Sequence, residues 1–361
     1  MPLRLGFQKM GAGGGGVFVL FSTYTATSRR MKGIPVFFRP EGFSVTTPAT
    51  VLEGVPGPLI PGTCHEAVLA GVRTRYWQYG LGMNTGVFYS KDFPKVLMVH
   101  GFRGDHHGLE IIANRLLALM PGADVISPDL PGFGRSDELS GQVSIESYVQ
   151  WLHALIERVA SGQKVLLVGH SFGSIVAAAY AAAHPETLDR LCLINPISEP
   201  ALEGKHQAGP ALASFYYWVG ASLPERMGYA LLRSQLITRA TSEVMMRSKD
   251  PLMRRFINGQ HAAYFGSFAS RRGVLEAYRV SISKTAAQYA PQIRVPVQML
   301  VAEDDDLGTV ETADAMFEAL EGRPQSPGQR FDLIPEVGHL IHYETPTLAA
   351  RLIADFVREE F

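Results

Sequence analysis

Short apolar segments alternate with amphipathic ones along most of the chain. Residues 95–100 and 164–168 are almost wholly apolar and are bounded by proline, glycine or polar residues, a pattern typical of strands buried on both faces of a sheet. Apolar residues at helical spacing predict helices at 108–119, 145–159 and 174–183. The alternation predicts right-handed crossovers and a mostly parallel sheet, and hence an α/β fold class. The same criteria predict further strands at 74–79, 124–127, 191–194, 297–301 and 330–334, and helices at 310–320 and 346–359.

One long segment breaks this alternation. Residues 199–290 contain no convincing buried strand, and their periodic stretches at 214–221, 226–237 and 241–247 predict helices. A helical layer inserted between two strands is expected to cover one end of the sheet as a cap. The predicted core then comprises residues 46–198 and 291–361.

The N-terminal segment differs from the rest in charge. Residues 1–40 hold six basic residues and no acidic one, together with a Gly-Ala-Gly-Gly-Gly-Gly run at 11–16. Because they lack a periodic apolar face, residues 1–45 are predicted to form a disordered extension. The alternative is a leader peptide, since basic residues precede the apolar run 17–21, but that run is short for a signal peptide. We therefore favour a cytoplasmic location.

Composition argues against several classes of protein. The 33 basic and 34 acidic residues give a net charge of −1, which disfavours a surface built for nucleic acid. Cys64 and Cys192 lie far apart and outside any metal-binding spacing, so neither a disulfide scaffold nor a structural zinc site is expected. No apolar run approaches the ~18 residues of a membrane span. The sequence predicts no particular oligomeric state.

The sharpest chemical signal is a Gly-His-Ser-Phe-Gly pentapeptide at 169–173. It fits the pattern Gly-x-Ser-x-Gly and lies between the strand at 164–168 and the helix at 174–183. Glycines are needed on both sides of the serine because the chain reverses there in a tight, strained turn with no room for side chains. Such a turn projects the hydroxyl group of Ser171, which is the expected nucleophile.

In this context the motif resembles the nucleophile turn of the α/β-hydrolase family, and the resemblance covers nearly all of residues 65–361. It implies a mostly parallel central sheet of the α/β-hydrolase type, with a helical cap inserted between two strands. It also implies a serine hydrolase that needs no cofactor. The dehalogenases and epoxide hydrolases of the family carry aspartate at the nucleophile position, so Ser171 argues against both.

A serine hydroxyl is too weak an acid to attack unaided, so a histidine must take its proton. The family places this base on the loop after the last strand. His339 follows the predicted strand at 330–334 and occupies that position. The neighbouring His342 is expected to line or support the loop.

The base needs a carboxylate that fixes its tautomer and stabilises the imidazolium ion. The family carries this acid after an earlier strand, and a run of four carboxylates at 303–306 follows the strand at 297–301. Asp305 matches the family position, with Asp304 and Asp306 as alternatives for a solvated turn. Some relatives carry the acid at the end of the strand before the cap, where this chain has Asn195, an amide that cannot serve as the charged partner.

The family stabilises the oxyanion of the reaction with two backbone amides. The His-Gly-Phe-Arg segment at 100–103 corresponds to its oxyanion loop, so the amides of Phe102 and Phe172 are the expected donors, with His100 buttressing the loop. The Asp-His-His run at 105–107 suggests a metal site, but adjacent histidines rarely converge on one ion without further ligands, and no metal is predicted.

The cap is expected to decide which substrate reaches Ser171. Its aromatic residues predict an apolar pocket wall, with Trp218 and Phe265 as substrate-binding candidates, and its arginines offer a site for a carboxylate. The candidate arginines are Arg233, Arg239, Arg254 and Arg255. The favoured hypothesis is an esterase or lipase acting on a small apolar ester through an acyl-enzyme. A carbon–carbon bond hydrolase, a perhydrolase or acyltransferase, and a non-catalytic binding protein remain as alternatives.

Overall fold

The computed structural model describes part of the chain in detail. The described residues are 43–45, 53–80, 94–160, 162–200, 208–322 and 328–360. The chain divides into two units, Met1–Arg39 and Pro40–Phe361, and every described residue belongs to the second. The extension or leader expected for residues 1–40 lies outside the described residues.

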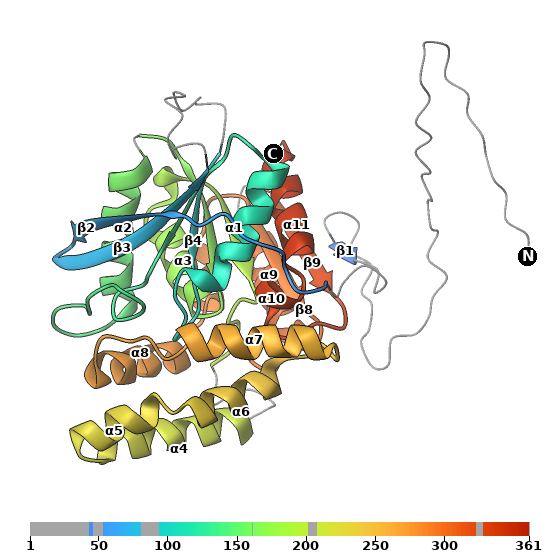
Figure 1. Cartoon of the computed structure of the whole chain (residues 1–361). Coiled ribbons are helices and arrows are strands. Elements are labelled where there is room, and N and C mark those ends of the chain that lie inside the picture. The colour runs from blue at the N-terminus through green and yellow to red at the C-terminus, as the bar shows by residue number, and fades with distance from the viewer. Residues whose placement is uncertain are drawn as a thin grey trace, which may run out of the picture. The chain divides into compact units, whose positions relative to one another are not determined.

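In the described part of the chain, nine strands form one sheet in the order β1-β9-β8-β7-β6-β4-β5-β3-β2 (Figure 1). All neighbouring strands are parallel except for the pairs β2–β3 and β3–β5. The predicted α/β class with a mostly parallel sheet is therefore confirmed. The strands are β1 Phe43–Val45, β2 Thr63–Leu69, β3 Val72–Gly80, β4 Lys95–Val99, β5 Asp124–Pro128, β6 Val165–His170, β7 Leu188–Ile194, β8 Val297–Ala302 and β9 Gln329–Ile334.

The first strand corrects a predicted boundary. Phe43–Val45 pairs in parallel with β9 at Phe331–Leu333, although residues 1–45 were expected to lie outside the core. Three residues are too short for a periodic apolar pattern, so the sequence carries no local signal for this strand. The sheet thus begins within the segment that was assigned to the extension.

Helices cover both faces of the sheet, because alternate residues of each central strand point to opposite sides. Val96 and Met98 of β4 pack in the cluster with helices α1 and α11, whereas Leu97 and Val99 pack with α2, α3 and α9. The apolar runs of the sequence therefore supply two cores from the same strands. The core helices are α1 His107–Leu119, α2 Ile145–Ala160, α3 Phe172–Ala183, α9 Val310–Glu321, α10 Ile341–Glu344 and α11 Pro346–Arg358, with short 3₁₀ turns η2 Pro185–Thr187 and η3 Ala287–Gln292.

The segment between β7 and β8 is helical, as its sequence predicts, and Figure 1 shows its helices gathered at one end of the core. Glu344 of α10 attaches this helical segment to the core. Its buried carboxylate accepts hydrogen bonds from the backbone amides of Arg247 and Ser248. The cap helices are α4 Ala208–Ser222, α5 Glu225–Leu232, α6 Gln235–Met245, α7 Pro251–Tyr264 and α8 Arg271–Ser283.

Two details of the cap differ from the predicted helices. The helix expected over 226–237 is broken, since α5 ends at Leu232 and Ser234 has the extended backbone of a residue that precedes a new helix. Helices α7 and α8 had no predicted counterpart, although each begins with a side-chain cap: Asp250 accepts from the amide of Leu252, and Ser270 from that of Gly273. These capping residues were the available signal.

Candidate active site

Ser171 lies in the turn between β6 and α3, with φ 54° and ψ −121°. This left-handed backbone is strained for a residue other than glycine. The flanking glycines are required by close packing: a Cβ atom on Gly169 would lie 2.5 Å from the carbonyl oxygen of Gly173, and one on Gly173 would lie 2.2 Å from that of Val99. Because strand and helix approach this closely, the Ser171 side chain is directed away from them.

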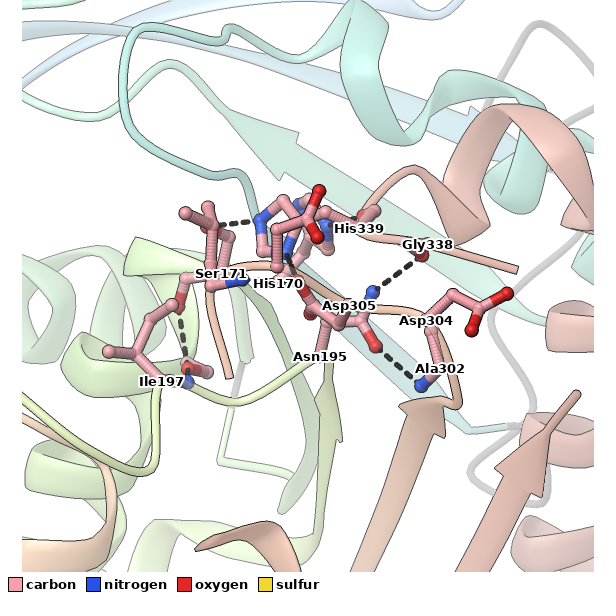
Figure 2. A network of polar contacts seen from close by, with 12 residues as sticks. His170, Ser171, Asn195, Ile197, Ala302, Asp304, Asp305, Gly338 and His339 are labelled. Atoms are coloured by element: carbon pink, nitrogen blue, oxygen red, sulfur yellow. Dashed lines mark hydrogen bonds and ion pairs between the residues drawn. The ribbon is translucent and has the colours of Figure 1, made fainter. Parts of the chain in front are cut away.

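The three expected triad residues converge in one hydrogen-bonded chain (Figure 2). His339 Nε2 lies 2.8 Å from Ser171 Oγ, and His339 Nδ1 lies 2.8 and 3.0 Å from the two carboxylate oxygens of Asp305. All three side chains are buried. Since the carboxylate only accepts, Nδ1 carries the proton and Nε2 is free to accept the proton of the serine hydroxyl.

The acidic residues at 303–306 differ in the contacts that their side chains make. Asp305 faces His339, and its Oδ1 also accepts from the amide of Leu307 at 2.8 Å. Asp306 borders the cavity but pairs with Arg247 at 2.6 Å, and Glu303 accepts from the amide of Glu336 at 3.2 Å. Only one of these carboxylates aligns with the imidazole ring, and it is the one expected.

Asn195 connects the two loops that carry Asp305 and His339. Its Oδ1 accepts from the amide of Ala302, at the end of the strand before Asp305, at 2.9 Å. Its Nδ2 donates to the carbonyl of Gly338, next to His339, at 3.2 Å (Figure 2). The sequence drew attention to Asn195 only as a missing acid. Its positive φ of 44° at the end of a central strand is the feature that marks it as specialised.

Two further histidines pack around His339. His170 donates from Nε2 to the carbonyl of His339 at 3.3 Å. Burial, together with the neighbouring His339, lowers the pKa of His170 to about 3, so it stays neutral beside the base. Burial also lowers the pKa of His342 well below its ordinary value, and its ring packs against that of His170 at 4.3 Å between centroids. Both rings support the loop.

The expected oxyanion loop lies directly beside the nucleophile. A Cβ atom on Gly101 would come within 3.1 Å of Ser171 Cβ, so glycine allows the backbone to approach. His100 buttresses the loop, since Nδ1 donates to the carbonyl of Gly101 at 2.8 Å and Nε2 accepts from the amide of Leu130 at 2.9 Å. Phe102 and Phe172 both border the cavity next to Ser171, with ring centroids 6.4 Å apart.

The Asp-His-His run at 105–107 forms a compact cluster whose ligand-type atoms lie within 4.8 Å of one another. Hydrogen bonds account for these atoms: Asp105 accepts from His107 Nδ1 at 3.0 Å, and His106 Nδ1 donates to Asp129 at 2.8 Å. The His106 ring also stacks on Trp77, with centroids 3.3 Å apart. These contacts give the run a structural role at the start of α1.

A cavity of about 1060 Å³ lies over Ser171 and His339. Cap side chains form its other walls, and most of the lining is apolar. Phe265 is among them, as expected. Other lining side chains from the cap are Phe215, Tyr217, Val219, Ile237, Val244 and Met245.

Trp218, the other expected substrate-binding residue, does not line this cavity. Its side chain is 63% exposed, whereas the preceding Tyr217 is 7% exposed. Successive residues of a helix point about 100° apart, so seating Tyr217 against the core turns Trp218 outward, where it stacks on Phe215. The four cap arginines considered for a carboxylate also lie off the cavity lining; Arg103 is the arginine that borders it.

Comparison with known proteins agrees with this geometry. The family model described as serine aminopeptidase, S33, matches residues 91–346. The chain belongs to this α/β-hydrolase family. Monoacylglycerol lipase ABHD6 of Homo sapiens is 24% identical over 305 residues, which cover 78% of this chain and 84% of that protein. Lipase LipV of Mycobacterium tuberculosis is 29% identical over 274 residues, 72% of this chain and 91% of that protein.

Solved structures share the fold. The enol-lactonase from Burkholderia xenovorans LB400 superposes with a TM-score of 0.64 at 16% identity, covering 82% of this chain and 100% of that one. A thermophilic esterase from Thermogutta terrifontis gives a TM-score of 0.61 at 22% identity over 82% and 98% of the two chains. The family and fold expected from the motif are thereby confirmed. Among the described helices of this chain, none has the length and apolar character to cross a membrane.

Proposed function

We propose that the protein is a carboxylic-ester hydrolase that works through an acyl-enzyme on Ser171. The observation that carries this proposal is the continuous hydrogen-bond chain from Ser171 through His339 to Asp305 at the base of an apolar cavity. Monoacylglycerol lipase ABHD6 and lipase LipV are both lipases by name, which supports ester hydrolysis by this chain.

The proposed reaction has two halves. His339 Nε2 accepts the hydroxyl proton as Ser171 Oγ attacks the ester carbonyl carbon, and the amides of Phe102 and Phe172 stabilise the resulting oxyanion. The protonated imidazole, stabilised by Asp305, gives its proton to the departing alcohol and leaves an acyl-enzyme. Water then attacks the acyl group with His339 again as base, and collapse of the second intermediate releases the carboxylic acid and returns the proton to Ser171.

The cavity favours an acyl chain longer than acetyl. Its apolar walls gain up to about 0.8 kcal/mol for each methylene group that they bury fully, so turnover should rise with chain length until the cavity is filled. Phe265 is proposed to contact this chain. A carbon–carbon bond hydrolase would need a cation for the substrate carboxylate. The four cap arginines lie away from the lining, and Arg103, which borders the cavity, already donates to two carbonyls and the hydroxyl of Tyr217.

A substrate panel on the purified protein tests this function. We expect hydrolysis of p-nitrophenyl esters and of monoacylglycerols, with an optimum at medium or long chains, and no cleavage of a vinylogous 1,5-diketone. Cleavage of the diketone alone would favour the carbon–carbon hydrolase. Peroxide and short alcohols, added as competing acceptors, would reveal perhydrolysis or acyl transfer.

The Ser171→Ala variant tests the nucleophile. It should fold, as judged by circular dichroism, while losing turnover by roughly a thousandfold or more, because members of a triad act as a unit. It should also lose labelling by a fluorophosphonate. A variant that retained most of its activity would remove Ser171 from the mechanism.

A further inference from the structure

Arg103 is a buried arginine whose partners are all neutral. Its side chain is 4% exposed. Nη2 donates to the carbonyl of Leu232 at 2.6 Å, Nε to that of Phe265 at 3.2 Å, and Nη1 to the hydroxyl of Tyr217 at 3.4 Å. No carboxylate among the described residues forms an ion pair with it. A buried charge without a counter-ion needs another source of stabilisation.

The cap supplies that stabilisation. Leu232 is the last residue of α5, and Phe265 directly follows the last residue of α7. The last carbonyls of a helix have no hydrogen-bond partner within the helix and carry a partial negative charge. The ends of two helices, α5 and α7, place such carbonyls against one guanidinium group. The rings of Phe265 and Phe268 lie 5.1 and 5.7 Å from its central carbon, within the range of cation–π attraction. Three segments of the cap therefore hold a side chain that belongs to the core.

The backbone of Arg103 is part of the oxyanion loop. The amide of Gly104 donates to the carbonyl of Gly101 at 3.1 Å, which closes a turn with Phe102 and Arg103 at its centre. Arg103 has φ 63°, a conformation that glycine adopts freely and arginine does not. Contacts of its side chain must hold it there. The Phe102 amide belongs to the first peptide unit of this turn.

We propose that Arg103 is a positioning residue that makes the oxyanion hole depend on a seated cap. This rests on the proposed function, in which the Phe102 amide stabilises the oxyanion. When the cap is in place, its helix ends hold the guanidinium group and so keep the turn in its strained form. When the cap moves away, the guanidinium group loses its acceptors, the turn relaxes, and the amide of Phe102 no longer points at the oxyanion.

Two substitutions test the coupling. Arg103→Asn removes the contacts to the cap but keeps a residue that tolerates a positive φ. Arg103→Lys keeps the charge but cannot reach both carbonyls and the hydroxyl at once. Arg233→Ala is the matched control, because Arg233 is an exposed arginine at the end of α5 that borders no part of the cavity. Concentrations of active enzyme are set by active-site titration, so that loss of folded protein does not count as loss of rate.

The readouts separate positioning from folding. Because an oxyanion hole acts on the transition state, kcat for p-nitrophenyl acetate should fall at least about tenfold in Arg103→Asn with little change in KM. The inhibition constant of a trifluoromethyl ketone, which forms a tetrahedral adduct on serine, should weaken by the same factor. Binding of the matched methyl ketone should not change. Arg103→Lys should lie between Arg103→Asn and the parent, and Arg233→Ala should equal the parent.

Each contrary result is informative. A kcat within twofold of the parent in Arg103→Asn, or a fall in kcat without weaker binding of the trifluoromethyl ketone, would overturn the coupling. If Arg103→Asn does not fold, Arg103→Lys decides the question, since parental kcat there would overturn it equally. Activity in Ser171→Ala would instead defeat the proposed function, so the two failures are distinguishable.

Discussion

At the scale of single residues, backbone strain collects at Ser171 and in the loops that meet beside it. Five described residues other than glycine have positive φ, and four belong to segments that carry or flank the expected machinery: Arg103, Ser171, Asn195 and Glu336. The fifth, Ala70, lies in the tight turn between β2 and β3. Strain of this kind persists only where surrounding contacts determine the backbone, and here hydrogen bonds and close packing do so.

Asp305 and its neighbour provide a matched pair of substitutions. Asp305→Asn should reduce kcat by roughly 10³–10⁴-fold, because an amide no longer fixes the tautomer of His339 or stabilises its charged form. Asp306→Asn breaks only a half-exposed pair with Arg247, and such pairs contribute about 0–1 kcal/mol. Steady-state kinetics on one ester should therefore show near-parental turnover for Asp306→Asn. Equal losses in the two variants would show that the acid is misassigned.

At the scale of elements, the contact between α3 and β4 decides where Ser171 sits relative to the loop at 100–103. The helix begins at Phe172 and the strand ends at Val99, one residue before His100. A Cβ atom on Gly173 would lie 2.2 Å from the carbonyl oxygen of Val99 and 2.7 Å from that of His100. Neither backbone atom can move without shifting the strand.

Two glycine substitutions measure this contact. Gly173→Ala should destabilise the protein by at least about 2–3 kcal/mol through overpacking, and it should lower turnover by separating Ser171 from the loop. Gly108→Ala is the control, because Gly108 lies in α1 with no atom within 4 Å of an added Cβ, and alanine there should stabilise by up to about 1 kcal/mol. Thermal unfolding of both variants gives the comparison, and a stable, active Gly173→Ala would contradict the packing argument.

Helix α4 offers a test of which cap side chains touch substrate. Phe215 and Trp218 are 60% and 63% exposed, but only Phe215 borders the cavity. Phe215→Ala should lower kcat/KM for a long-chain ester roughly fivefold, because about 1 kcal/mol of apolar contact is lost. The kcat/KM for the acetyl ester should stay nearly unchanged. Trp218→Ala should leave the whole chain-length profile intact. A profile that shifts more in Trp218→Ala would place the substrate on the outer face of α4.

At the scale of the whole molecule, buried histidines tie stability to pH. Burial lowers the pKa of His170 to about 3 and that of His261 to about 4, against an ordinary value near 6.5. Both are therefore neutral in the folded protein over the neutral range. The free energy of unfolding is therefore unaffected by these histidines above about pH 6.5. It falls as the pH drops toward their pKa values in the folded protein, because the unfolded chain then binds more protons than the folded one.

Urea unfolding at a series of pH values checks this linkage. The free energy of unfolding should fall between pH 6.5 and pH 4, by about 1.4 kcal/mol per pH unit for each such histidine. In His261→Gln, where the amide can keep a hydrogen bond to Ser242, the slope should be smaller by about that amount. An unchanged slope would mean that His261 is not forced to be neutral by the fold. Burial raises the pKa of Glu344. As the pH falls, the folded protein binds a proton there before the unfolded chain does, so this group increases the free energy of unfolding.

Local patterns were enough for the framework and for the chemical centre. Continuous apolar runs predict strands such as β4 and β6 because a strand covered on both faces has no polar position. The turn at Ser171 is encoded by the glycines on either side of it, which no other residue can replace. His339 and Asp305 could be named because the resemblance to the α/β-hydrolase family places the acid and the base after these two strands, and the strand order brings the loops after β8 and β9 to the edge where β6 ends.

Tertiary contacts decided the remainder. The outward direction of Trp218, the break between α5 and α6, the bridge made by Asn195 and the three partners of Arg103 each depend on segments distant in sequence. An aromatic residue on a helix is equally apolar whether it faces a cavity or solvent. The sequence around an arginine in a loop likewise does not indicate which helix ends will contact it. The amino-acid sequence therefore determines the fold and the convergence of Ser171, His339 and Asp305, whereas the walls of the cavity and the attachment of the cap to Arg103 arise only when the chain has packed.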